Sequence, residues 1–123
     1  MGVASYRDLL VWQKAMDYTV GCYQLTDQFR RTETYGLSSQ LRRSAVSIAS
    51  NIAEGAGRMH TREYMYHVSV ASGSLTESET QILLAQRLGY ITEEQVLPVL
   101  SLSAEIGRML RGLNAALERK AEH

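Results

Sequence analysis

Apolar residues recur every three or four positions along almost the whole of this chain, and no other feature constrains its fold as much. That spacing places apolar side chains on one face of an α-helix. No segment has the strand, turn and strand pattern of a β-hairpin. Turn-forming and capping residues divide the pattern into four parts. The sequence therefore predicts helices over about residues 8–29, 38–56, 61–88 and 92–120.

Each predicted helix carries one apolar stripe that we expect to face a shared core. The stripes are Leu9, Trp12, Met16, Val20 and Tyr23; Leu41, Ala45, Ile48 and Ile52; Met65, Val68, Ala71 or Ser72, Leu75, Ile82 and Leu83; and Val99, Ser103, Ile106, Leu110, Leu113 and Leu117. Four amphipathic helices of this length, joined by short loops, are typical of an antiparallel up-and-down four-helix bundle. At 123 residues the chain has the size of one such domain.

Capping residues set the expected helix ends. We expect Ser38 or Ser39 to cap the second helix, Thr61 to cap the third, Gly89 to end the third, and Thr92 and Gln95 to form a capping box on the fourth. Pro98 lies in the second turn of the fourth helix, where it removes one backbone hydrogen bond. We expect a kink there.

The sequence contains no pattern of catalytic residues. A di-iron bundle site needs a Glu-x-x-His sequence from each of two helices, and the chain has none. His60, Glu63 and His67 share one helix face, a weak metal pattern that surface histidines explain better. The lone Cys22 offers neither a disulfide nor paired metal ligands, and we expect it to be buried. We predict a protein that is not an enzyme and binds no metal or cofactor.

We expect a cytoplasmic protein. The first ten residues lack the basic and apolar regions of a secretory signal, and no stretch of about 18 apolar residues predicts a membrane span. A single cysteine fits a reducing compartment.

The second predicted helix has more apolar surface than one internal seam needs. Beside its core stripe lies a second sector, formed by Arg42, Val46, Ala49 and Ala53. Small and apolar residues there allow a neighbouring backbone to approach closely, and an arginine among them must reach water or a carboxylate. These four residues are the candidate oligomer interface.

A polar stripe occupies the third sector of the same helix. It consists of Gln40, Arg43, Ser47, Asn51, Glu54 and Arg58. Such a stripe is either a solvated face or a hydrogen-bonding surface for a partner chain or a nucleic acid.

The residues from Tyr35 to Arg58, YGLSSQLRRSAVSIASNIAEGAGR, resemble a bacterial family of four-helix-bundle proteins encoded in intervening sequences of large-subunit (23S) ribosomal RNA genes. Residues 6–15, YRDLLVWQKA, and 106–113, IGRMLRGL, are similar to the same family. The resemblance implies a homopentamer. It also implies kinship with the accessory variability proteins of diversity-generating retroelements, which bind nucleic acid and a reverse transcriptase.

Charge is uneven along a chain whose formal net charge is zero. Arginines outnumber glutamates over residues 30–67, whereas glutamates dominate residues 77–105. Opposite charges on one molecule either pair within one bundle or allow head-to-tail contacts between copies that close into a ring. We therefore expect a ring-like homo-oligomer that acts as a scaffold or interaction module.

The alternative is a ring that binds RNA or DNA, or an enzyme acting on them, through a basic rim. That surface would comprise Arg30, Arg31, Arg43, Asn51, Arg58 and Arg62. Repetition in several copies would make even a modest positive charge effective on a phosphate backbone.

Overall fold

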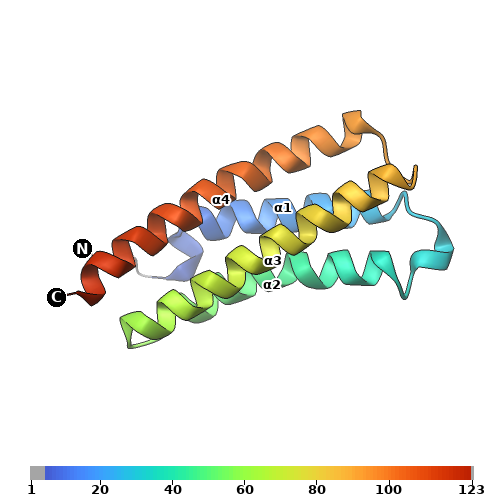
Figure 1. Cartoon of the computed structure of the whole chain (residues 1–123). Coiled ribbons are helices and arrows are strands. Elements are labelled where there is room, and N and C mark those ends of the chain that lie inside the picture. Colours follow the sequence, from blue (N-terminus) through green and yellow to red (C-terminus); the bar gives the residue numbers. More distant parts are fainter. Residues whose placement is uncertain (1–4, 123) are drawn as a thin grey trace.

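The computed structural model describes residues 5–122, and every regular element within them is helical. The elements are the 3-10 turns η1 (Tyr6–Asp8) and η2 (Arg31–Glu33) and the α-helices α1 (Leu10–Thr26), α2 (Leu37–Ala56), α3 (Thr61–Arg87) and α4 (Glu93–Ala121). Successive helices run in opposite directions, so the predicted antiparallel four-helix bundle is confirmed for one chain (Figure 1).

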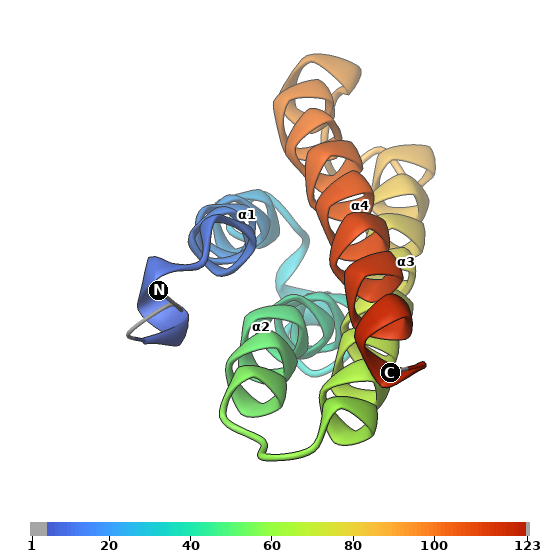
Figure 2. The same ribbon diagram turned by 90° about the vertical axis from the view of Figure 1, so that its left-hand side faces the viewer.

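Each helix packs against two neighbours. Helix α2 lies between α1 and α3, and α4 closes the bundle by packing on both α3 and α1. Seen along its length, the molecule has α1 and α2 on one side and α3 and α4 on the other (Figure 2). The connections at residues 27–36 and 88–92 lie at one end of the bundle, and the connection at residues 57–60 lies at the other (Figure 1).

The core stripe predicted for α2 is confirmed. Leu41, Ala45, Ile48 and Ile52 have no measurable exposure. On α3 and α4 most predicted core residues are also buried. Met65, Val99 and Leu113 are partly buried against the core, and Leu83 is 47% exposed.

The stripe predicted for α1 is wrong from Met16 onward, although Leu9 and Trp12 pack against the core as predicted. Met16, Val20 and Tyr23 are 42%, 56% and 39% exposed. The buried face of α1 instead comprises Val11, Ala15, Tyr18, Cys22 and Leu25. Both stripes have helical spacing, and the buried one contains a small alanine, a cysteine and a tyrosine hydroxyl, so hydrophobicity alone favoured the wrong face.

The cap of α2 also differs from the prediction. The helix begins at Leu37, and the N–H of Leu37 donates to the Glu33 carboxylate over 3.0 Å. Ser38 and Ser39 therefore lie inside the first turn. Glu33 supplies the acceptor expected from a serine, because η2 brings this side chain back to the helix start.

The other helix ends follow their predicted signals with small shifts. The capping box of Thr92 and Gln95 is present, and Gly89 adopts a positive φ of 82° after the last turn of α3. His60, not Thr61, holds the cap position of α3. Helix α4 continues through Pro98 as one element.

Candidate functional site

The four residues of the candidate interface lie on the side of α2 that faces α1, and α1 covers part of them. Ala49 is buried and Ala53 is half-buried, whereas Val46 is 42% exposed. The guanidinium of Arg42 donates to the Thr26 hydroxyl over 2.8 Å and pairs with Asp27 at 3.3 Å. The carboxylate that Arg42 was expected to meet is therefore that of Asp27 in the same chain.

The exposed residues that were expected in the core of α1 continue this surface. Met16, Val20 and Tyr23 of α1, together with Val46 of α2, form what we call the α1–α2 apolar face. Val20, Tyr23 and Val46 line a shallow pocket of about 400 Å³. A helix face that meets only water ordinarily carries polar residues at these positions. This face therefore has the character of a contact surface.

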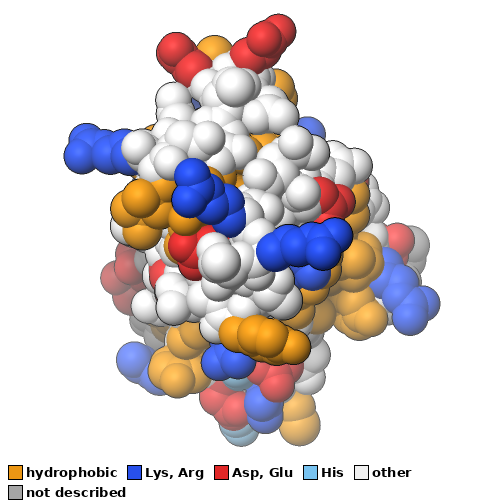
Figure 3. Space-filling view, turned by 90° about the vertical axis from the view of Figure 1, so that its right-hand side faces the viewer, with side chains coloured by type: hydrophobic (Ala, Val, Ile, Leu, Met, Phe, Trp, Pro, Cys, Tyr) orange, Lys and Arg blue, Asp and Glu red, His pale blue; other side chains and the backbone are white. Residues whose placement is uncertain are grey.

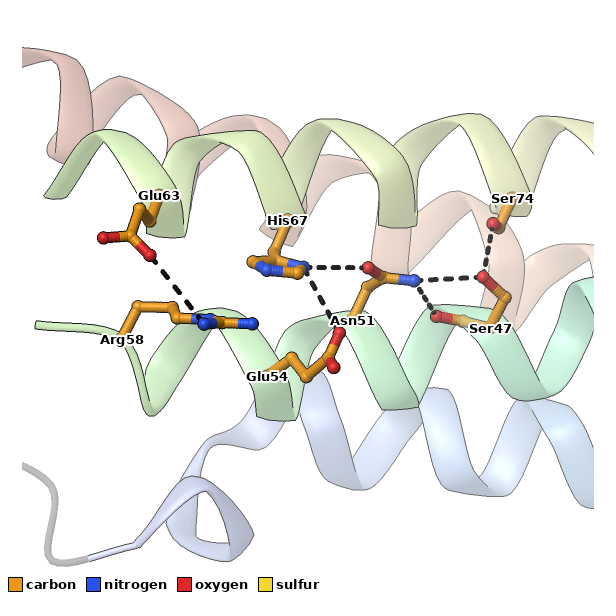
Figure 4. Close-up of polar contacts among 7 residues, drawn as sticks. All are labelled: Ser47, Asn51, Glu54, Arg58, Glu63, His67 and Ser74. Carbon is orange, nitrogen blue, oxygen red and sulfur yellow. Dashed lines mark hydrogen bonds and ion pairs between the residues drawn. The ribbon is translucent and has the colours of Figure 1, made fainter. Parts of the chain in front are cut away.

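The polar stripe of α2 divides into an internal and an external part. Ser47 and Asn51 turn toward α3, where the Ser74 hydroxyl donates to Ser47 over 2.8 Å (Figure 4). The side-chain amide N–H of Asn51 donates to the Ser47 carbonyl. The Oδ1 atom of Asn51 is then the acceptor for Nδ1 of His67 at 3.0 Å. Because Asn51 is engaged inside the chain, it is not a free donor for nucleic acid.

The same helix pair holds further polar contacts along its length. The buried Ser44 hydroxyl donates to Gln81 over 2.7 Å. Nδ1 of His67 also lies 3.5 Å from Glu54 (Figure 4). We call the pairs Ser44–Gln81, Ser47–Ser74 and Asn51–His67 the α2–α3 polar seam.

The candidate basic residues do not form one rim within a single chain. Arg58 and Arg62 lie near the 57–60 connection, and Arg58 approaches Glu63 at 3.9 Å (Figure 4). Arg30 and Arg31 lie in the 27–36 connection at the other end of α2. Twenty helical residues separate these groups by about 30 Å. Arg43 is exposed on α2 between them.

The structure instead joins Arg42 to Arg30 and Arg31. All three line a pocket of about 180 Å³ at the end of the bundle formed by the 27–36 connection. Figure 3 looks onto this end and shows several Lys and Arg side chains there, with acidic side chains at its upper edge. One arginine predicted for self-assembly and two predicted for nucleic acid thus share one site.

The core contains a polar pair that sequence reasoning missed. The hydroxyls of Tyr18 and Ser78 lie 2.7 Å apart, and the Ser78 hydroxyl donates to the Leu75 carbonyl. Burial raises the pKa of Tyr18, and burial also raises the pKa of Cys22 to about 12. Both groups remain protonated at neutral pH.

One sequence signal could have located the polar seam. His67, Ser74 and Gln81 recur every seven residues, the spacing that keeps side chains on one seam between packed helices. No comparable signal marks the arginine pocket, because its residues come from the end of α1, an irregular connection and α2.

Among residues 5–122, no helix is long and apolar enough to cross a bilayer. In the same range, no three His, Cys, Asp or Glu side chains are grouped as metal ligands would be.

Comparison with known proteins gives a family and similar solved structures. Residues 7–112 match the family model for the 23S rRNA-intervening sequence protein. A crystal structure of a protein of unknown function from the S23 ribosomal protein family of Bacteroides thetaiotaomicron is 25% identical in sequence. Its superposition gives a TM-score of 0.79 and covers 85% of this chain and 98% of that one. No curated protein matches.

Proposed function

The chain belongs to the 23S rRNA-intervening sequence protein family, and from that premise we propose that it is a non-enzymatic, homo-oligomeric interaction module whose copies assemble as a ring-like pentamer. The observation that carries the proposal is the α1–α2 apolar face, formed by Met16, Val20, Tyr23 and Val46. The pentameric number is the one that the family resemblance implies.

A second copy of the chain is the occupant that its surface chemistry favours. The side of the molecule formed by α3 and α4 carries its own exposed leucines, Leu83, Leu88 and Leu97, each about half exposed. Different apolar residues exposed on different helices of one chain allow a head-to-tail contact, and repetition of such a contact closes a ring.

Charge favours the same arrangement. Arg30 and Arg31 lie in the 27–36 connection and Arg42 in the second turn of α2, and the exposed Glu93 and Glu94 begin α4 at the same end of the bundle. Opposite charges on neighbouring copies would orient the contact, while the apolar surfaces would provide most of the free energy of association.

Light scattering in line with size exclusion tests the proposal. We expect the wild-type protein to have five times its chain mass of 13.8 kDa. Val20→Glu places a charge on the α1–α2 apolar face and should give a smaller species with unchanged helical circular dichroism.

Met59→Glu is the matched control, because Met59 is 94% exposed in the 57–60 connection. It should keep the wild-type mass. A wild-type protein that is monomeric at every concentration, or equal dissociation of both variants, would contradict the assembly proposal.

A second candidate function is binding of RNA or DNA, or of an enzyme that acts on them. The grouping of Arg30, Arg31 and Arg42 favours it. Affinity for single-stranded RNA should then fall steeply as salt is raised, since phosphate contacts release counterions. An RNA affinity that is negligible at low salt would exclude this candidate.

A further inference from the structure

We propose that the pocket at the amino-terminal end of α2 is a binding site for a single phosphate group. Its walls come from the end of α1, the 27–36 connection and the first turns of α2. A volume of about 180 Å³ admits a small tetrahedral anion together with a few waters. This inference does not depend on self-assembly, because one chain supplies every wall.

The Ser38 side chain is the first observation that points to a ligand. Ser38 is only 8% exposed as a residue and lines the pocket. Its hydroxyl forms no hydrogen bond within residues 5–122 and keeps contact with solvent, since no buried side-chain oxygen in that range lacks a partner. Other buried hydroxyls of the molecule are paired, as that of Ser44 is to Gln81. A hydroxyl that keeps solvent contact at a pocket wall can donate to an oxygen of a bound anion.

Backbone groups at the start of α2 add further donors. Among the backbone N–H groups of this turn, the Glu33 carboxylate accepts that of Leu37, while its other oxygen accepts the Tyr90 hydroxyl. The next N–H with a backbone acceptor is that of Gln40, which bonds to the Gly36 carbonyl. Within the described chain the N–H groups of Ser38 and Ser39 have no acceptor. Free N–H groups and the partial positive charge of a helix start favour an anion.

Three arginine residues line the pocket, of which Arg30 places its guanidinium 6.0 Å from the centre of the Tyr90 ring. Arg42 is held in place by Thr26 and Asp27 and stacks over the Tyr23 ring at 4.6 Å. The side chain of Arg31 is exposed and forms no ion pair or hydrogen bond with the described part of the chain. Arg31 is therefore free to close over a ligand.

Asp27 is the one acidic group of the pocket. Its side chain is 68% exposed and its Oδ1 atom is engaged by Arg42. Three arginines against one aspartate leave the lining with a positive charge. Guanidinium groups recognise phosphate through paired N–H donors. A lining with more arginines than carboxylates therefore suits a phosphate better than a metal cation.

Inorganic phosphate is the first probe, added at constant ionic strength against chloride. In about 10 mM phosphate, we expect the backbone amide NMR signals of Ser38 and Ser39 to shift in a saturable way, as for a site with a Kd of about 1 mM. Arg31→Gln and Ser38→Ala should each weaken the affinity about tenfold, since each removes a hydrogen bond to a charged group.

Arg43→Gln is the matched control. Arg43 is exposed on the same helix outside the pocket, so its loss changes the net charge equally and should leave phosphate affinity within about twofold. Equal weakening by Arg31→Gln and Arg43→Gln, or the absence of amide shifts at Ser38 and Ser39, would overturn the proposal.

A short single-stranded RNA distinguishes a phosphate in a nucleic acid from free phosphate. RNA binding that Arg31→Gln and Ser38→Ala weaken as they weaken phosphate binding would support a nucleic-acid source. Phosphate binding at the pocket with RNA affinity insensitive to both variants would support a free phosphate compound. If neither phosphate nor RNA binds at the pocket, the expected oligomer mass does not change, so the assembly proposal is tested separately.

Discussion

Cys22 has no measurable exposure and lies beside Tyr18 in the core. Because burial raises the pKa of its thiol to about 12, the reactive thiolate is scarce at neutral pH. Ellman's reagent should therefore modify the native protein at least about a hundredfold more slowly than the urea-unfolded chain. Rapid modification of the folded protein would mean that this part of α1 opens readily.

Gly55 and Gly73 are helical glycines with opposite surroundings. A Cβ atom at Gly55 would lie 2.8 Å from Cδ1 of Tyr64 and 2.9 Å from Cβ of His67, whereas a Cβ at Gly73 meets nothing within 4 Å. Gly55→Ala should lower the free energy of unfolding by about 1–3 kcal/mol. Gly73→Ala should raise it by about 0.5–1 kcal/mol. Urea unfolding of both variants measures the contrast, and a stabilised Gly55→Ala would contradict the close approach of α2 and α3.

The sequence predicts a residue's place correctly where its chemistry allows only one kind of position. Gly89 was predicted to end the third helix, and it follows the last turn of α3 with a positive φ. Cys22 was predicted to be buried, and it is. The prediction failed for Met16 and Val20, since α1 has apolar residues on two faces and only packing decides which face the other helices cover. Asn51 was predicted to face another molecule. Its hydrogen-bond partner is His67, which lies sixteen residues away on another helix and could not be paired with it from the sequence.

At the scale of elements, the start of α2 depends on Glu33. Its carboxylate accepts the N–H of Leu37 and the hydroxyl of Tyr90, which lowers the pKa of Glu33 below its ordinary 4.5. The stabilisation is therefore fully present above about pH 4.5 and is lost as the pH falls through the folded-state pKa.

Glu33→Gln should be less stable than the wild type near neutral pH, and the difference should narrow in acid. Thermal unfolding between about pH 3 and pH 7 measures it. Tyr90→Phe removes one of the two bonds to the carboxylate and should reduce the pH dependence only partly. A stability difference that is constant with pH would contradict the capping role.

Periodicity predicts the existence of the four helices better than their ends. The first helix was expected over residues 8–29 and spans Leu10–Thr26, because η1 precedes it and hydrogen-bonded turns follow it. The site at the start of α2 was beyond sequence reasoning for the same reason. Its walls are turns whose geometry depends on contacts with α1 and on Glu33.

At the scale of the whole molecule, self-assembly predicts a stability that depends on concentration. If only folded chains associate, mass action raises the thermal midpoint as protein concentration rises. Wild-type protein should show this rise in scanning calorimetry, and Val20→Glu should lose it. A midpoint independent of concentration in the wild type would contradict a stable oligomer.

The α2–α3 polar seam restricts how the two helices can align. Ser44, Ser47 and Asn51 find partners on α3 only in the observed alignment, and a slide along the axis would leave buried hydroxyl and amide groups unpaired. Purely apolar helices tolerate such slippage far more readily. The seam therefore fixes the register of the α2–α3 hairpin through paired polar groups, in addition to the packing that α1 and α4 provide.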